Sequence, residues 1–241
     1  MNGHISYGQD KIDYKIIVNP TLATKVKIHV HPNGTVEVEV PEQTEYEEIH
    51  SAVLKRSRWI SKQVETTQQA HAYVLPREYI SGETHFYLGR RHKLLVTETD
   101  KIPSKVALRR GRLEVTCRTA DPLAIKRRLS TWYRERAEKY FEKRILIAVS
   151  TINWLDDVPG FKLVNMNKQW GSCSPQRLIH LNPNLIKAPS DCIDYVITHE
   201  ICHIRERNHG RRYYELLERH YPQWRHVKTR LDGMAELLLA T

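Results

Sequence analysis

The sequence has no run of about 18 consecutive apolar residues, the length that a membrane-spanning helix needs. Its N-terminal stretch, MNGHISYGQDK, lacks the apolar core of a signal peptide. The four cysteines show no CxxC spacing, so the sequence predicts neither a disulfide framework nor a cysteine-based zinc knuckle. Internal repeats and low-complexity tracts are also absent. We therefore expect a cytoplasmic protein without membrane contacts.

Positive charge is concentrated in one segment of the 241-residue chain. Residues 101–150 carry a net charge of +9, whereas residues 1–100 and 151–200 each carry −1. Such a basic block suits contact with nucleic acid or another polyanion. The alternative is a solvated helix face that acidic groups balance elsewhere in the fold. No aromatic residues alternate with the charges, as binding of single-stranded nucleic acid would favour.

The first half of the chain predicts mainly β-structure. Alternating apolar and polar residues over 14–40 predict strands on either side of Pro32-Asn33-Gly34, a strong hairpin signal. Two further hairpins are predicted about Gly89-Arg90-Arg91 and about Arg110-Gly111. One helix is predicted before them, from apolar residues at helical spacing: Ile49, Val53, Ile60 and Val64.

The second half predicts mainly helices. Asp121-Pro122 is typical of an N-cap and first helical position, and a long apolar stripe follows it. Two short strands, FKLVNM and LIHLN, flank the segment KQWGSCSPQR, and a further helix is predicted from Pro189. The expected fold class is therefore α+β, with a β-rich part over 1–118 that contains one helix and a catalytic part over 119–241. No flexible linker marks the seam near residue 119, so one continuous domain is expected.

The stretch HEICHIRERNH suggests a metal site on that further helix. His199 and His203 are four residues apart, so an α-helix places both on one face. Glu200 lies beside that face, which is the pattern of H-E-x-x-H: two ligands and a general base for a water whose pKa zinc lowers to about 7. The opposite face is apolar and predicts burial of the helix: Ile193, Ile197, Ile201 and Ile204.

A third ligand is expected at His209, six residues after His203. No glycine lies between them, and we expect Asn208 to turn the chain, because asparagine tolerates a left-handed conformation. The spacing equals that of the metzincins, but their glycine position is Glu206 here, which argues against that clan. Three imidazoles favour zinc, so one Zn²⁺ per chain with an open position for water is expected.

Other side chains are candidates for lining the site. Cys192 and Tyr195 share the helical face of the first two histidines, although packing beneath the metal is the simpler role. Trp170 and Cys173 belong to a segment that we expect to form an edge strand beside the cleft, where an extended peptide can pair. A nucleophilic pair of Cys173 with His180 is disfavoured, because no helix N-terminus or cation is predicted beside the thiol.

Two aromatic residues follow the third histidine. Tyr213 and Tyr214 are candidate donors to a developing oxyanion. The same spacing also suits the apolar stripe of a short helix, and that interpretation is the simpler one.

Several motifs together resemble the YgjP-like, SprT-related zinc metallopeptidase family: WGSCS, APSDCIDYVITHE, NHG followed by two aromatics, and the N-terminal KVKIHVHPNGTVEVEVPE. The resemblance implies a zincin-like fold for the catalytic part, with His199, His203 and His209 as zinc ligands and Glu200 as the catalytic acid and base. The chain departs from the family pattern at Gln169, which stands where arginine is usual, and at Gly210, which stands where serine is usual. These departures concern the shape of the substrate pocket.

The expected activity is hydrolysis of peptide bonds in a protein or peptide substrate. Two alternatives stay open. One is a metal-dependent phosphohydrolase acting on nucleotides, which the basic block at 101–150 suggests. The other is a metal-stapled module that binds nucleic acid without catalysis.

Overall fold

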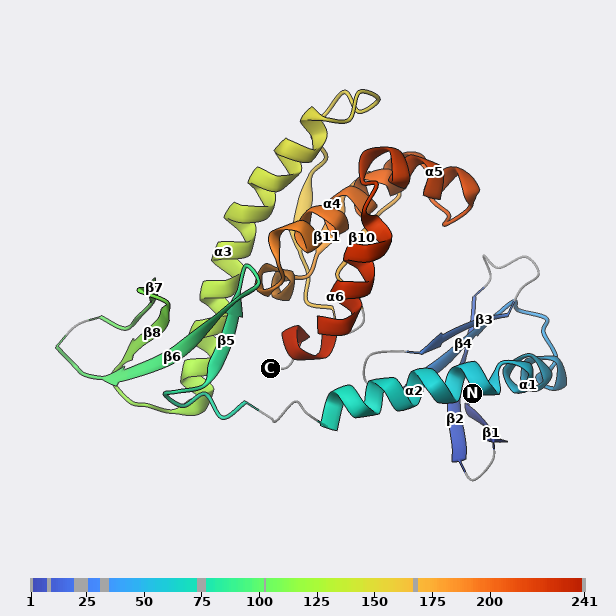
Figure 1. Ribbon diagram of the computed structural model, residues 1–241, viewed down its shortest axis with the longest axis horizontal. Helices are drawn as coiled ribbons and strands as arrows, with labels where there is room; N and C mark the ends of the chain where they lie inside the picture. The colour runs from blue at the N-terminus through green and yellow to red at the C-terminus, as the bar shows by residue number, and fades with distance from the viewer. Residues whose placement is uncertain are drawn as a thin grey trace. The chain divides into compact units, whose positions relative to one another are not determined.

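The computed structural model describes residues 2–7, 10–19, 26–30, 35–72, 77–101, 103–166 and 169–239. The chain divides into two compact units, Met1–Leu75 and Pro76–Thr241 (Figure 1). Each unit has its own hydrophobic core. Among the described residues, no helix combines the length and the apolar character needed to cross a membrane.

The first unit contains a four-stranded sheet of order β1-β2-β4-β3. Its strands are β1 (Asn2–Tyr7), β2 (Asp10–Val18), β3 (Lys27–Val30) and β4 (Val36–Val40). β2 and β4 are parallel, and the other neighbours are antiparallel. β3 and β4 therefore pair as the sequence predicts, whereas the predicted turn residues Pro32-Asn33-Gly34 lie outside the described residues.

The helix predicted in this unit is two helices, α1 (Tyr46–Lys55) and α2 (Ser57–Ala72). Arg56 interrupts them with φ −110° and ψ 8°, and its N–H bonds to the Val53 carbonyl rather than continuing the α-helical ladder. The expectation of one helix was wrong because the apolar spacing continues across the break: Ile49, Val53 and Ile60 are all buried in the same core. A seven-residue interval preserves the buried face, so periodicity alone does not reveal the interruption.

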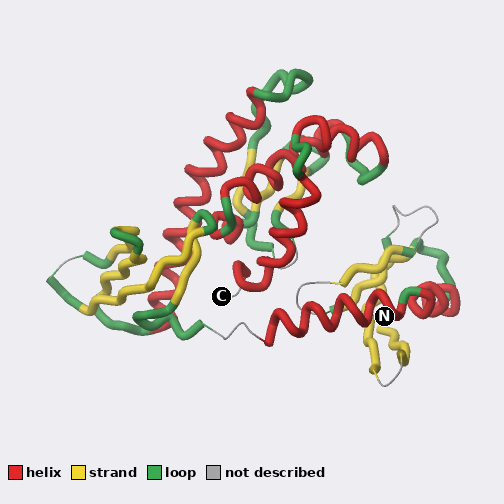
Figure 2. Tube along the Cα trace, viewed as in Figure 1, coloured by secondary structure: helices red, strands yellow, loops and turns green. Residues whose placement is uncertain are grey.

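The second unit begins with another four-stranded sheet, of order β5-β6-β8-β7 (Figure 2). Its strands are β5 (Thr84–Tyr87), β6 (Arg90–Glu98), β7 (Lys105–Arg109) and β8 (Arg112–Cys117). Both predicted hairpins are present. Their turns have positive φ at both central residues, at Leu88-Gly89 and at Arg110-Gly111, as a two-residue hairpin turn requires. The first turn thus lies slightly before its predicted position, Gly89-Arg90-Arg91.

A long helix, α3 (Pro122–Ser150), joins this sheet to the rest of the unit. The Asp121 side chain caps it by accepting a hydrogen bond from the Ala124 N–H at 2.8 Å, as predicted. Its buried residues pack in one core with Leu94 and Leu113 of the sheet and with Ile193 and Ile197 of a later helix. The two compact units therefore divide at residues 75 and 76 rather than near 119, because the β5–β8 sheet shares its core with α3.

The rest of the second unit forms a small sheet and three helices. The three-stranded sheet has the order β10-β11-β9, with β9 (Phe161–Leu163), β10 (Gly171–Cys173) and β11 (Ile179–Leu181). A short 3₁₀ helix, η1 (Pro183–Lys187), leads into α4 (Ser190–Arg205), which is followed by α5 (Arg211–His220) and α6 (Trp224–Leu239). β10 is an edge strand, and it packs beside α4.

Candidate metal centre

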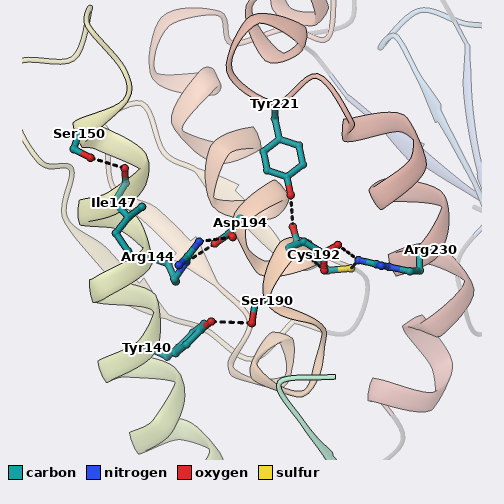
Figure 3. Close-up of polar contacts among 10 residues, drawn as sticks. Tyr140, Arg144, Ile147, Ser150, Ser190, Cys192, Asp194, Tyr221 and Arg230 are labelled. Atoms are coloured by element: carbon teal, nitrogen blue, oxygen red, sulfur yellow. Dashed lines mark hydrogen bonds and ion pairs between the residues drawn. The ribbon is translucent and has the colours of Figure 1, made fainter. Parts of the chain in front are cut away.

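The helix α4 is held in the second unit by its apolar face and by polar contacts at its start. Ile193, Ile197 and Ile201 are fully buried, as the sequence predicts. On the side of α3, Arg144 makes a two-pronged ion pair with Asp194, and the Tyr140 hydroxyl bonds to Ser190 Oγ at 2.9 Å (Figure 3). These contacts leave the face that carries the histidines turned toward a cleft.

The side of α4 that faces α6 is also fixed near its first turn. Arg230 of α6 pairs with Asp191 and donates to Cys192 Sγ at 3.5 Å (Figure 3). Tyr221 donates from its hydroxyl to the Asp191 carbonyl at 2.8 Å. Cys192 is fully buried, and burial raises the pKa of its thiol. It packs beneath the helix start and is not among the residues that line the cleft, which agrees with the packing role.

The three histidines of the motif converge on one point. His209 Nε2 lies 3.1 Å from His203 Nε2 and 3.2 Å from His199 Nε2. Ligands of a tetrahedral zinc ion at about 2.0–2.1 Å are separated from one another by roughly 3.3 Å. These two separations therefore fit a zinc ion, and a cluster of three imidazoles is a set of donors that zinc prefers.

The protonation of the histidines also suits a metal. Burial, together with the neighbouring His203 and His209, lowers the pKa of His199 to about 3. Burial lowers the pKa of His203 as well. Its Nδ1 lies 3.0 Å from the Glu206 carbonyl oxygen, which only accepts, so Nδ1 carries the proton and the lone pair is on Nε2. Both imidazoles are thus neutral near pH 7, as ligands must be.

The chain reaches His209 by a different turn from the one expected. Asn208 does not have the left-handed backbone that the sequence suggested, since the described non-glycine residues with positive φ are Tyr79, Leu88, Arg110 and Arg177. Instead, Glu206 ends α4 with an extended backbone, φ −123° and ψ 98°. That conformation also aims its carbonyl at His203. The redirected chain needs no left-handed residue because it leaves the helix by extension.

Tyr213 packs against the histidine cluster. It is fully buried, its ring stacks on His203 with centroids 4.5 Å apart, and its hydroxyl donates to the His199 carbonyl at 3.2 Å. Tyr214 stacks on Trp224, with centroids 5.2 Å apart, and its ring centroid lies 6.2 Å from that of His209. Neither tyrosine is among the residues that line the cleft. The structure thus gives both a packing role in α5 rather than a place at the cleft wall.

Glu200 lies in the wall of the cleft and is almost fully buried, with 4% of its surface exposed. Its Oε2 has no hydrogen-bond partner among the described residues, and burial raises the pKa of the carboxyl to about 8. Gly171 of β10 lies directly against it. A Cβ at Gly171 would come within 2.8 Å of both Cγ and Oε1 of Glu200, so only glycine lets the strand approach this closely.

The cleft over the histidines has a volume of about 450 Å³. Trp170, Cys173 and Tyr195 line it, as the sequence suggested. Cys173 is not a credible nucleophile, because burial and the nearby Glu200 raise the pKa of its thiol. Gln169, Gly171 and Ser172 also line the cleft, from the segment expected beside it. The sequence did not indicate the other lining residues, namely Ser174, Pro175, Val196, Arg207, Lys228, Leu231 and Asp232.

The sequence gives only a weak indication of the cleft-lining residues on α6. Lys228 and Asp232 are four residues apart and form an ion pair across one helical turn. The spacing identifies the pair, but the sequence does not show that α6 lies across the cleft from α4. Gly171 carried a stronger signal, since a glycine within a predicted strand often marks a close approach of another group.

Three comparisons with known proteins bear on this site. The family model described as YgjP-like, metallopeptidase domain, matches residues 24–234. No curated protein matches the sequence. Among solved structures, the metallopeptidase zymogen of Methanocaldococcus jannaschii jannalysin matches with 15% identity and a TM-score of 0.34, over 38% of this chain and 92% of that chain.

The family match covers most of the chain: it includes the HEICHIRERNH stretch and β10 and extends over parts of both compact units. The resemblance inferred from the sequence motifs is therefore confirmed. The chain belongs to the YgjP-like metallopeptidase domain family.

Proposed function

We propose that this protein is a zinc-dependent peptidase in which His199, His203 and His209 hold one Zn²⁺ and Glu200 is the general base. The observation that carries the proposal is the convergence of three Nε2 atoms beside a buried carboxylate in one cleft. Zinc in such a site lowers the pKa of a water molecule to about 7 and polarises a carbonyl group.

The chain's own residues would divide the remaining work. Glu200 would accept the proton of the attacking water and pass it to the leaving amine, since its Oε2 has no partner among the described residues. Gly171 fixes how closely β10 approaches this carboxylate.

The position of β10 supports a peptide as the substrate. β10 is the edge strand of its sheet, and Gly171, Ser172 and Cys173 all line the cleft. An extended peptide can add to such an edge through main-chain hydrogen bonds, which would lay a scissile bond across the histidine cluster. A nucleotide has no backbone to pair with a strand, so this arrangement favours the peptidase over the phosphohydrolase.

The decisive experiment compares the wild-type enzyme with Glu200→Gln on two substrate classes. Zinc-loaded protein is incubated with unfolded casein and, separately, with nucleoside triphosphates, and new N-termini and released phosphate are measured. We expect casein cleavage by the wild type and a loss of about 10²- to 10⁴-fold in the variant, with zinc content unchanged. Phosphate release without casein cleavage would contradict the proposal and support the phosphohydrolase. Full cleavage by the variant would contradict the role of Glu200.

A further inference from the structure

The four-stranded sheet of the second unit has two unlike faces. Alternate residues of a strand point to opposite sides. Leu94 of β6 and Leu113 and Val115 of β8 are buried in the core that includes α3. Lys93 and Arg112, which directly precede Leu94 and Leu113, are exposed and belong to the other face. At these two positions the outer face is exposed to solvent, whereas Phe86 and Thr116 on the same face are buried.

Strand pairing aligns three cations on that outer face. Lys93 of β6 lies opposite Arg112 of β8, and Arg112 lies opposite Arg109 of β7. All three side chains are exposed. Neighbouring strands are about 4.8 Å apart, so the row spans roughly 10 Å. Like charges directly opposite one another destabilise a sheet, and here two such pairs share one residue.

Three more arginines surround this row at the turn end of the sheet: Arg90, Arg91 and Arg110. We call the six residues Arg90, Arg91, Lys93, Arg109, Arg110 and Arg112 the turn-end patch. Within the part of the chain that the structure describes, none of the six forms an ion pair with a carboxylate. The first acidic residue along the outer face, Glu114, lies one row farther from the turns.

The basic residues of α3 are placed differently. Arg144 pairs with Asp194, Arg134 donates to the Leu163 carbonyl at 2.9 Å, and Arg136 lies over the Trp132 ring at 5.3 Å. Three glutamates are interspersed with the cations of the helix: Glu135, Glu138 and Glu142. Three of the five arginines of α3 thus make contacts within the fold and glutamates lie among its cations, whereas none of the six cations of the turn-end patch pairs with a carboxylate among the described residues.

From this contrast we propose that the turn-end patch binds the phosphate backbone of duplex nucleic acid. Six exposed cations without a carboxylate are complementary to a closely charged polyanion, and bound phosphates would relieve the repulsion across the strands. The patch offers no exposed aromatic side chain for base stacking, because Phe86 on this face is only 7% exposed and Arg91 lies over its ring. Contacts limited to phosphates would give binding that does not depend on base sequence.

The test compares two triple variants that remove the same charge from the full-length protein. The first is Lys93→Gln, Arg109→Gln and Arg112→Gln in the patch. The control is Arg127→Gln, Lys139→Gln and Lys143→Gln, exposed on α3. Binding to fluorescein-labelled duplexes of about 20 base pairs, one of DNA and one of RNA, is measured by anisotropy across a salt series. Retained thermal unfolding transitions show that both variants fold.

We expect the wild type to bind a duplex with strong salt dependence. The patch variant should bind on the order of 10- to 100-fold more weakly, with a salt slope reduced by about 3, since each lost phosphate contact lowers the slope by roughly 0.9. The control should lose less than about 3-fold. The DNA and RNA arms show which duplex is preferred.

Four results would overturn the proposal. They are no binding to either duplex, equal losses in the two triple variants, tighter binding of a single strand than of both duplexes, or binding of oligoglutamate in place of the duplexes. Equal losses of affinity in the two triple variants would show that binding depends on the net charge of the protein and not on the patch. Oligoglutamate binding would instead identify the partner as an acidic protein segment.

Discussion

The metal centre and the turn-end patch lie in the same compact unit but arise in different ways. The candidate metal centre is built from one helix and the segment that follows it, so its three histidines are at most ten residues apart in sequence. The patch is built from the register of three strands, which places Lys93 beside Arg112, 19 positions away, and Arg112 beside Arg109. Spacing in the sequence therefore predicts the histidine cluster, whereas the turn-end patch arises only when the strands pair.

The largest expected effect comes from a substitution in the candidate metal centre. His209→Ala removes one of the three converging nitrogens, so the variant should lose stoichiometric zinc and with it essentially all peptidase activity. Elemental analysis after dialysis against a weak chelator measures the metal. Full retention of zinc in the variant would exclude His209 as a ligand.

A smaller but still large effect is expected from Gly171→Ala. The added Cβ must displace the Glu200 carboxylate, and a misplacement of about 1 Å can reduce kcat by about 10²-fold. Zinc content should not change, because Gly171 contacts none of the three histidines through that position. Gly233→Ala in α6 is the matched control, since its Cβ would meet no atom within 4 Å. Equal kcat values in the two variants would refute the positioning role.

Lys187 is a buried basic residue, unlike the exposed cations of the turn-end patch, and its protonation should affect the stability of the fold. Burial lowers the pKa of Lys187 to about 7, from 10.5. Between these values the unfolded chain binds more protons than the folded one, so the free energy of unfolding should rise with pH over this window, by an amount on the order of a few kcal/mol.

Lys187→Met should remove that pH dependence, although it also deletes the hydrogen bond to the Leu238 carbonyl. Loss of that hydrogen bond does not change the direction in which the free energy of unfolding varies with pH. Urea unfolding at intervals from pH 7 to 10 measures this dependence. Parallel pH profiles for wild type and variant would show that Lys187 stays charged in the fold.

The smallest expected effect concerns the repulsion between like charges in the turn-end patch. Arg112→Gln removes both like-charge pairs of the row, so the protein should become more stable by a few tenths of a kcal/mol at low salt. The gain should fade as salt screens the repulsion. Urea unfolding at two salt concentrations checks this. A loss of stability at low salt would mean that Arg112 makes favourable contacts within the fold.

Much of the fold follows from local patterns. Alternation predicted the strands on either side of both turns of the second unit, and Asp121-Pro122 marked the start of α3. Expectations were wrong where a change of backbone direction leaves no mark on the spacing of apolar residues. Arg56 divides a helix without disturbing its buried face, and Glu206, rather than Asn208, redirects the chain toward His209.

The sequence alone determined that two histidines share a helical face with a carboxylate beside them, because helical geometry is the same wherever the helix lies. It did not determine the close approach of β10 to Glu200, the position of α6 across the cleft, or the row of cations on the sheet. These depend on which elements pack or pair with one another, and such contacts join residues whose separation in the chain carries no periodic signal. The tertiary structure therefore decided the walls of the cleft and the location of the patch, while spacing in the sequence identified the histidines.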